Sequence, residues 1–418
     1  MLENRRPIST ALVLVCFYMF LVIERPWESV RYLQGIPLER FYALALIIVV
    51  FLRGRLKIVP SNTNKWVYGL LALHFLLAPF AFNSGFAVDQ GIEYAKMVVL
   101  YALMLAVVED EDCLRFLIMA YVFSTMFYVL HSFLEYYNGR HVFRMGISRM
   151  MGADKTFSDP NSLGATVVLT LPFVYALLRT ELNKYLSLAY YLFFIVAVTC
   201  VVLTGSRTSF AALLVLCFLW VLGQQGKRRI IIFFTALLSI AVVWNAMPLD
   251  KQVRFRSLWD EDAGPESARQ SAEGRMAGWK ASWRMFNQQP LTGVGAGGEN
   301  YIGYRLTHDV DDGYPSAHQS HVLYGEVLAE FGIVGAFVFL GLVTSIFSNC
   351  YRVRLRLRNK SEVKPFKANL AAAIMVSLLL LLTLGIGGHN FYRPLWLWLA
   401  AWSGALSMLT SERANEQG

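Results

Sequence analysis

Charged residues are scarce in this sequence, and their scarcity excludes an ordinary soluble fold. Only 16% of the 418 residues are charged, whereas 56% are hydrophobic and 14% are aromatic, and the mean hydropathy is +0.45. A typical soluble domain has about 25% charged residues. The chain is too apolar to face water on all sides, and we infer that it is an integral membrane protein.

Short segments of alternating hydrophobicity, which are typical of a membrane β-barrel, are also missing. The apolar runs are instead continuous and approach the roughly 20 residues that a helix needs to cross a bilayer. We predict an all-α membrane protein, a bundle of about twelve transmembrane helices. The predicted spans lie near 8–23, 37–52, 66–82, 92–108, 114–134, 163–178, 186–204, 209–223, 230–246, 322–348, 367–385 and 393–409.

Cysteine is rare, and no two cysteines have a C-x-x-C spacing. We interpret the five cysteines as packing residues and expect neither a metal centre nor a cofactor. The formal net charge of +9 would suit a nucleic-acid partner, but the basic residues gather in short loops between the apolar runs. We therefore attribute the charge to membrane topology and expect no nucleic acid to bind.

The basic loops predict how the chain is oriented. Clusters of Lys and Arg that include Arg53, Lys227 and Arg352 follow the second, eighth and tenth predicted spans. Basic loops stay on the cytoplasmic side. Even-numbered spans should therefore end in the cytoplasm, with both termini there. We expect the first apolar segment to be a retained helix and not a cleaved signal.

One long polar connection divides the chain. We predict spans 1 to 9 within 1–246, a long outer loop at 247–320, and spans 10 to 12 with a cytoplasmic C-terminal end within 321–418. Part of the outer loop should be helical, because apolar residues recur there at three- and four-residue spacing. This stripe is expected to lie on the membrane or on the bundle, and it consists of Met276, Trp279, Trp283 and Phe286.

His321 stands at the outer mouth of the tenth predicted span. A histidine at such a site can be neutral near pH 7 and accept a proton, as a general base requires. A purely structural interfacial histidine is the alternative. Glu326 and Glu330 lie deeper on the same span, and carboxylates inside a membrane need partners or a cavity.

Two arginines are candidates for binding a phosphate. Arg207 lies in a very short outer connection, and Arg275 begins the predicted loop helix. The planar guanidinium group donates paired hydrogen bonds to phosphate oxygens, although anchoring at the interface is an alternative role for Arg207. The glycine-rich run at 290–298 lacks the Lys-Ser/Thr of a P-loop, so we interpret it as a tight backbone turn.

A second outer segment, 135–162, supplies further possible site residues, namely Arg144, Arg149 and Asp159. The acidic run Asp309, Asp311 and Asp312 comes nearest to a cation or carboxylate-pair site. We interpret that run as a solvated loop and predict no metal ligands.

The second half of the chain resembles the O-antigen ligase and polymerase family of polytopic glycosyltransferases. In that family the histidine is usually followed by Asn, Ser or Gln, whereas Val322 stands here, and His318 could share or replace the role of His321. Three motifs carry the resemblance: Ser206-Arg207; Gly274-Arg275 with Trp279 and Pro290 to Gly295; and His321 with Gly332 and Gly335.

The resemblance implies a metal-independent, inverting transfer at the periplasmic face of a bacterial inner membrane. The donor would be a glycan linked to undecaprenyl diphosphate, and the acceptor would be the lipid A-core oligosaccharide. His321 would orient or deprotonate the acceptor hydroxyl, while Arg207 and Arg275 would neutralise the diphosphate. The long loop at 247–320 would then be periplasmic.

Other functions stay open at this point. Within the same family, the protein could be a polysaccharide polymerase or a protein O-oligosaccharyltransferase. In a different class, it could transport a lipid-linked glycan, and a transporter would have charged residues across the membrane midplane and repeated halves. No internal repeat is evident in the sequence.

Overall fold

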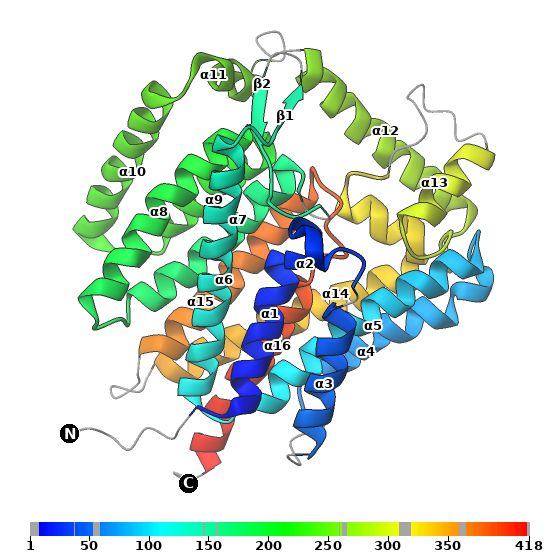
Figure 1. Ribbon diagram of the computed structural model, residues 1–418, viewed down its shortest axis with the longest axis horizontal. Helices are drawn as coiled ribbons and strands as arrows, with labels where there is room; N and C mark the ends of the chain where they lie inside the picture. Colours follow the sequence, from blue (N-terminus) through cyan, green and yellow to red (C-terminus); the bar gives the residue numbers. More distant parts are fainter. Residues whose placement is uncertain are drawn as a thin grey trace.

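The structure is a computed structural model that describes residues 8–36, 38–52, 59–144, 147–155, 158–258, 260, 266–308, 319–358 and 365–415. Every predicted span coincides with a helix (Figure 1). These helices are α1 (Thr10–Glu24), α3 (Leu38–Leu52), α4 (Asn64–Leu76), α5 (Ser84–Val107), α6 (Glu111–Tyr137), α7 (Pro160–Leu178), α8 (Lys184–Thr204), α9 (Arg207–Leu222), α10 (Gly226–Ala246), α14 (Leu323–Arg358), α15 (Pro365–Gly385) and α16 (Leu395–Asn415).

The predicted fold class is confirmed as that of a polytopic helical membrane protein. Within the described residues, eight helices are long and apolar enough to cross a membrane. Helices α3, α4 and α9 have only 15, 13 and 16 residues, so the number of crossings stays a prediction. Helix α14 has 36 residues and is broken at Gly332, where the backbone leaves helical geometry.

Helix α7 lies at the centre of the bundle, against α6, α8, α9 and α15. Large aromatic side chains fill the space around it. The Trp402 ring lies 5.1 Å from the rings of both Tyr121 and Phe173. Aromatic packing of this kind buries much apolar area in few residues. The centre of the bundle therefore supports the segments at its two ends.

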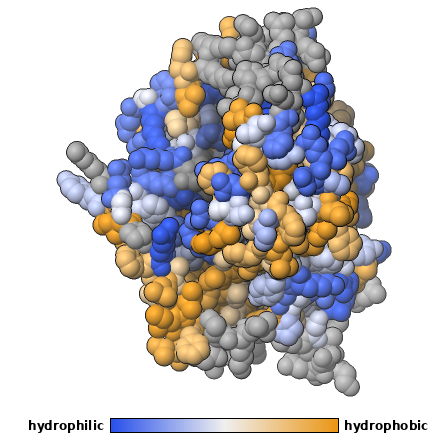
Figure 2. Space-filling view, turned by 90° about the vertical axis from the view of Figure 1, so that its right-hand side faces the viewer, coloured by the Kyte–Doolittle hydropathy of each residue, from blue (hydrophilic) through white to orange (hydrophobic). Residues whose placement is uncertain are grey.

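The outer helices show the opposite pattern. Helix α10 has no buried residue, and apolar side chains such as Ile231 and Leu238 are exposed on it. Hydrophobic residues also cover a broad area of the face in Figure 2, below a more hydrophilic upper part. Exposed apolar surface of this extent fits contact with lipid.

One end of the bundle carries almost all the remaining structure, and we call it the loop-bearing end (Figure 1, top). The hairpin there was not predicted, because four-residue strands leave little periodic signal; in it Val142 pairs with Arg149. The elements outside the long helices are α2 (Pro26–Ser29), η1 (Arg31–Leu33), η2 (Ala78–Phe80), β1 (His141–Arg144), β2 (Ile147–Met150), α11 (Leu249–Arg256), α12 (Glu266–Gln288) and α13 (Gly298–Thr307).

Helix α12 confirms that the long loop is partly helical, and it shows which face packs. Its small residues Ala277, Gly278 and Ala281 face the protein, whereas Met276 and Trp283 are 56% and 49% exposed. Small side chains let the helix approach α14 closely. Trp279 and Phe286 are half-buried, so the predicted apolar stripe faces the bundle in part, and its exposed part is suited to contact with a membrane.

Candidate active site

His321 lies at the loop-bearing end, immediately before α14, in an unusual backbone conformation. Its φ is 51°, in the left-handed region that residues other than glycine rarely adopt. The preceding residue is fixed by two hydrogen bonds. Ser282 of α12 donates to Ser320 Oγ at 2.9 Å, and Ser320 Oγ donates to the Val322 carbonyl at 3.0 Å.

A glycine on α12 makes this arrangement possible. A Cβ atom at Gly278 would lie only 2.2 Å from the Ser320 carbonyl oxygen, so no other residue fits without moving the backbone. Gly278 follows Arg275 by one helical turn. Arg275 lies inside α12 and not, as the sequence had indicated, at its start, and the same close approach brings this part of α12 next to the backbone that carries His321.

A second histidine, which sequence reasoning missed, faces His321. Nδ1 of His389 lies 3.1 Å from Nδ1 of His321, and the ring centroids are 5.0 Å apart. His389 comes from the connection between α15 and α16. The His389 side chain is exposed to solvent on one side. Nearby protein atoms nevertheless reduce the hydration of its ring, and this lowers the pKa of His389. The only sequence signal was a short polar break, Gly387-Gly388-His389-Asn390, between two apolar runs.

Buried carboxylates hold the connection that carries His389. The Phe391 N–H donates to Glu326 at 3.2 Å, and the Tyr392 hydroxyl donates to Glu330. Glu330 also accepts a hydrogen bond from the Gly297 N–H at 2.7 Å. The expectation that these two intramembrane carboxylates need partners is confirmed.

The other end of this connection is tied to α7. Arg393 donates to Thr166 Oγ1 at 3.1 Å and to the Ser162 carbonyl at 3.2 Å. The connection therefore bonds to α14 on one side and to α7 on the other. A loop anchored on both sides holds His389 in a defined place.

The two predicted phosphate-binding arginines lie near enough for the charge of Arg207 to act on Arg275, and Arg275 lies near the histidine pair. A Cβ atom at Gly387 would lie 3.3 Å from Cζ of Arg275 and 2.6 Å from Thr208, so Arg275 lies against the connection that carries His389. Arg207 begins α9, is only 8% exposed and donates to Ser257 Oγ at 3.1 Å. Burial, together with the positive charge of Arg207, lowers the pKa of Arg275 to about 10.

Two further cations bond to the turn between α8 and α9, and a third, Lys251, bonds to β2 and pairs with Asp250 at 3.4 Å. Arg149 donates to the Thr204 carbonyl at 2.8 Å, Arg254 donates to the Gly205 carbonyl at 2.7 Å, and Lys251 donates to the Ser148 carbonyl. The possible site residue Arg149 is thus brought to the site, and Arg254 and Lys251 were missed. We call Arg149, Arg207, Lys251, Arg254 and Arg275 the cationic cluster.

The other possible site residues do not belong to the cationic cluster. Asp159 caps α7 by accepting hydrogen bonds from the N–H groups of Asn161 and Ser162, at 2.8 and 3.1 Å. Its charge raises the pKa of His389, against the larger effect of burial. The backbone of Arg144 belongs to β1, but its side chain and the whole of His318 lie outside the described residues.

The glycine-rich run after α12 forms the tight turn that we expected. Gly293, Gly295 and Gly297 all have positive φ values, of 68°, 110° and 94°. The run packs against the break in α14, where the Ile333 N–H donates to the Pro290 carbonyl at 2.8 Å. A Cβ atom at Gly332 would lie 2.6 Å from the backbone at Leu291. These glycines are needed for close backbone approach, and they give no phosphate cradle of the P-loop kind.

In the described part of the chain, no three or more His, Cys, Asp or Glu side chains converge as metal ligands would. The acidic run at Asp309, Asp311 and Asp312 lies outside that part. What the described site offers is therefore a histidine pair beside a set of cations.

Comparison with known protein families finds one match. The model of the family described as O-antigen ligase matches residues 192–340, just over a third of the chain. The matched stretch runs from α8 into α14 and includes Arg207, Arg275 and His321, so the predicted resemblance is confirmed there. No curated protein matches the chain. The family match supports a ligase- or polymerase-type function in a multi-pass membrane protein.

Proposed function

We propose that this protein is a glycosyltransferase of the O-antigen ligase type. It would move a glycan from undecaprenyl diphosphate to a hydroxyl group of the lipid A-core oligosaccharide. One observation carries the proposal: Arg275 lies against the connection whose His389 contacts His321, and Arg207, from a separate element, is near enough for its charge to act on Arg275. A general base next to two adjacent cations suits the transfer of a sugar away from a diphosphate.

In the proposed reaction, His321 accepts the proton of the acceptor hydroxyl as its oxygen attacks the anomeric carbon of the donor sugar. The bond from that carbon to the diphosphate oxygen breaks, and undecaprenyl diphosphate leaves with the electron pair. Attack from the side opposite the leaving group inverts the anomeric centre. No metal is needed in this scheme, because arginine side chains take up the charge of the leaving group.

The electrostatics of the cationic cluster support this role. Burial and the neighbouring Arg207 lower the pKa of Arg275 only to about 10, so the Arg275 side chain is charged at neutral pH. Two cations held together repel each other, and a diphosphate placed between them would relieve that repulsion. The gain is larger in a partly dehydrated site than in water.

The membrane topology follows from the same proposal. Arg352, Arg354 and Arg356 lie near the C-terminal end of α14, while His321 precedes its N-terminal end. The positive-inside rule then puts the loop-bearing end in the periplasm of a bacterium and the far end in its cytoplasm. The divisions 1–246, 247–320 and 321–418 would be nine spans, a periplasmic loop and three spans.

A detergent assay tests the function. Undecaprenyl diphosphate glycan would be the donor and rough lipopolysaccharide the acceptor, with wild type compared to His321→Ala. The control is His141→Ala, a histidine on β1 whose ring is exposed at the same end and contacts Tyr136. We expect slower-migrating lipopolysaccharide from wild type and from His141→Ala only.

Other outcomes assign the alternatives. Longer lipid-linked glycan without modified lipopolysaccharide would indicate a polymerase, and glycan on an added pilin-type protein would indicate a protein O-oligosaccharyltransferase. A transferase should form product in detergent without any gradient. If wild type forms no transfer product at all but moves lipid-linked glycan across vesicles, the enzyme proposal is wrong and a transporter remains.

A further inference from the structure

We propose that His389 is a positioning residue that fixes the tautomer of His321 and so leaves the Nε2 lone pair of His321 for the acceptor hydroxyl. This inference rests on the proposed function, because it assigns a partner to the base of that reaction. Its starting observation is the 3.1 Å separation of the two Nδ1 atoms.

The contact between two Nδ1 atoms allows only two arrangements of protons when both rings are neutral. Either His321 carries the Nδ1 proton and donates to His389, or His389 carries it and donates to His321. In the second arrangement the only proton of His321 is on Nε2, and no lone pair remains to accept a substrate proton. Only the first arrangement gives His321 the form of a general base.

The first arrangement also persists through the reaction. Once His321 has taken the acceptor proton on Nε2, its Nδ1–H still donates to His389, now as a charge-assisted hydrogen bond. No proton has to be relocated within the pair. His389 thereby acts as the orienting group that stabilises the cationic form of the base without receiving its proton, a role that carboxylates fill in some hydrolytic triads.

This role requires His389 to be neutral and fixed. Two charged groups act on the pKa of His389 in opposite directions. Asp159 at the start of α7 raises it, and Arg393 in the same connection lowers it. The loss of hydration caused by the surrounding protein atoms has the larger effect, and it lowers the pKa of His389 and so disfavours its cation. The hydrogen bonds of Phe391 to α14 and of Arg393 to α7 hold the connection itself.

The backbone at His321 gives independent support. A histidine with a φ of 51° is strained, and such strain persists only where the surroundings enforce it. Here Ser320 and the close approach of Gly278 enforce it.

Three variants separate positioning from simple packing. His389→Asn keeps an acceptor atom at the place of Nδ1 but cannot be protonated. His389→Leu fills similar space without an acceptor, and His389→Ala removes the side chain. We expect Leu and Ala to lower kcat about 100-fold with the donor KM changed less than twofold, while Asn should restore kcat to within about fivefold of wild type.

The decisive readout is the tautomer of His321, measured by nitrogen NMR on histidine-labelled protein in detergent. The His321 signals would be assigned by their loss in His321→Gln. We expect the Nδ1–H form in wild type and in His389→Asn, and a shift toward the Nε2–H form in His389→Leu and His389→Ala. The Leu variant keeps the test valid if the Ala variant does not fold.

Each result either supports the role of His389 or contradicts it. An unchanged His321 tautomer in His389→Leu, or wild-type kcat in that variant, would overturn the inference. If the tautomer shifts as expected but wild-type protein forms no transfer product, the positioning of His321 by His389 stands and the proposed function fails. The two claims are therefore tested separately.

Discussion

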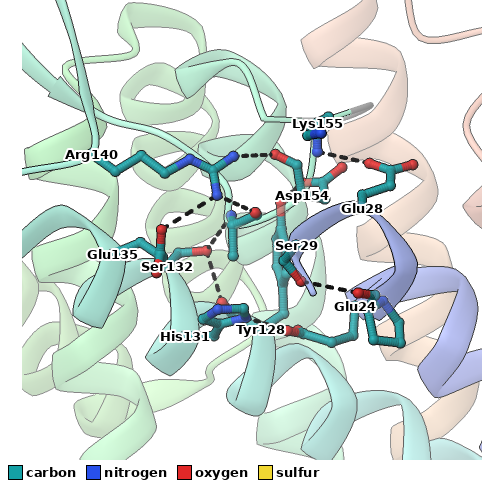
Figure 3. Close-up of polar contacts among 12 residues, drawn as sticks. Glu24, Glu28, Ser29, Tyr128, His131, Ser132, Glu135, Arg140, Asp154 and Lys155 are labelled. Atoms are coloured by element: carbon teal, nitrogen blue, oxygen red, sulfur yellow. Dashed lines mark hydrogen bonds and ion pairs between the residues drawn. The ribbon is translucent and has the colours of Figure 1, made fainter. Parts of the chain in front are cut away.

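Two polar clusters lie at the loop-bearing end, and they are built on opposite principles. Around α1 and α6, acidic side chains face histidine and arginine partners (Figure 3). His131 contacts Glu24, Arg140 contacts Glu135 at 3.5 Å, and Arg140 also donates to the carbonyls of Ala153 and Asp154. We call this the α1–α6 network. In the cationic cluster, by contrast, the positive charge of Arg207 adds to burial in lowering the pKa of Arg275.

This difference indicates which cluster stabilises the folded state. Satisfied polar networks stabilise one arrangement of the chain, and the α1–α6 network ties the segment after β2 to two helices in this way. Arg275 does the opposite. Because its pKa is lower in the folded protein than in the unfolded chain, its charge destabilises the native state at every pH below about 10. Residues that oppose stability are retained where function needs them.

The largest expected effect separates the α1–α6 network from the histidine beside the cationic cluster. His321→Ala should lower kcat at least about 1,000-fold and leave the melting temperature within about 2 °C of wild type. His131→Ala should do the reverse, with a lower melting temperature and near-normal activity per folded molecule, because Glu24 loses its partner. Turnover and thermal unfolding of both variants check this, and full activity of His321→Ala would refute the base assignment.

The next effect concerns the arginine pair. Arg275→Gln should reduce kcat/KM about 100-fold, since one donor to the developing diphosphate charge is lost. Its melting temperature should equal or exceed that of wild type, because a cation that destabilises the folded state is removed. Arg275→Lys should recover only part of the activity, since an ammonium lacks the paired donors. A clear drop in melting temperature in Arg275→Gln would show that Arg275 has a structural role.

A stability effect of middle size should come from the α1–α6 network. Arg140→Ala leaves two backbone carbonyls and Glu135 without their donor, which should lower the free energy of unfolding by about 1–3 kcal/mol. Transfer activity per folded molecule should stay within about twofold of wild type. Denaturant titration in detergent measures the first quantity. Loss of activity in fully folded Arg140→Ala would mean that the two clusters are not separate.

Much of this fold follows from the sequence alone. Long apolar runs such as those of α8 and α10 predict helices directly, because their hydrophobic length matches the bilayer. Histidine and arginine at the ends of apolar runs likewise indicated His321 and Arg207. The hairpin β1–β2 did not follow, since its pairing depends on contacts with neighbouring helices and not on a periodic pattern.

The missed site residues share one physical reason. His389 and Arg254 come from segments that lie far from His321 and Arg207 in the sequence, and only helix packing brings them together. Gly278 and Gly387 show the same limit. Their importance comes from what a Cβ atom would meet in space, which composition and spacing do not reveal.

The smallest predicted effect depends on pH. Because the pKa of Arg275 is about 10, raising the pH through that value removes its charge and weakens diphosphate binding. The dissociation constant should rise toward about tenfold per pH unit above pH 10, as expected for loss of one proton. In Arg275→Gln this rise should be absent. Titration of donor binding between pH 8 and 11 measures it, and equal curves for the two proteins would exclude Arg275 as the titrating group.

The most direct test of the account is the thermal shift caused by undecaprenyl diphosphate itself. A ligand that binds only the folded state raises the melting temperature. We expect undecaprenyl diphosphate to raise the melting temperature of wild type and of Arg140→Ala, each compared with the same protein without ligand. The melting temperature of Arg275→Gln should rise little or not at all. An equal rise in all three proteins would contradict the claim that the cationic cluster binds the diphosphate.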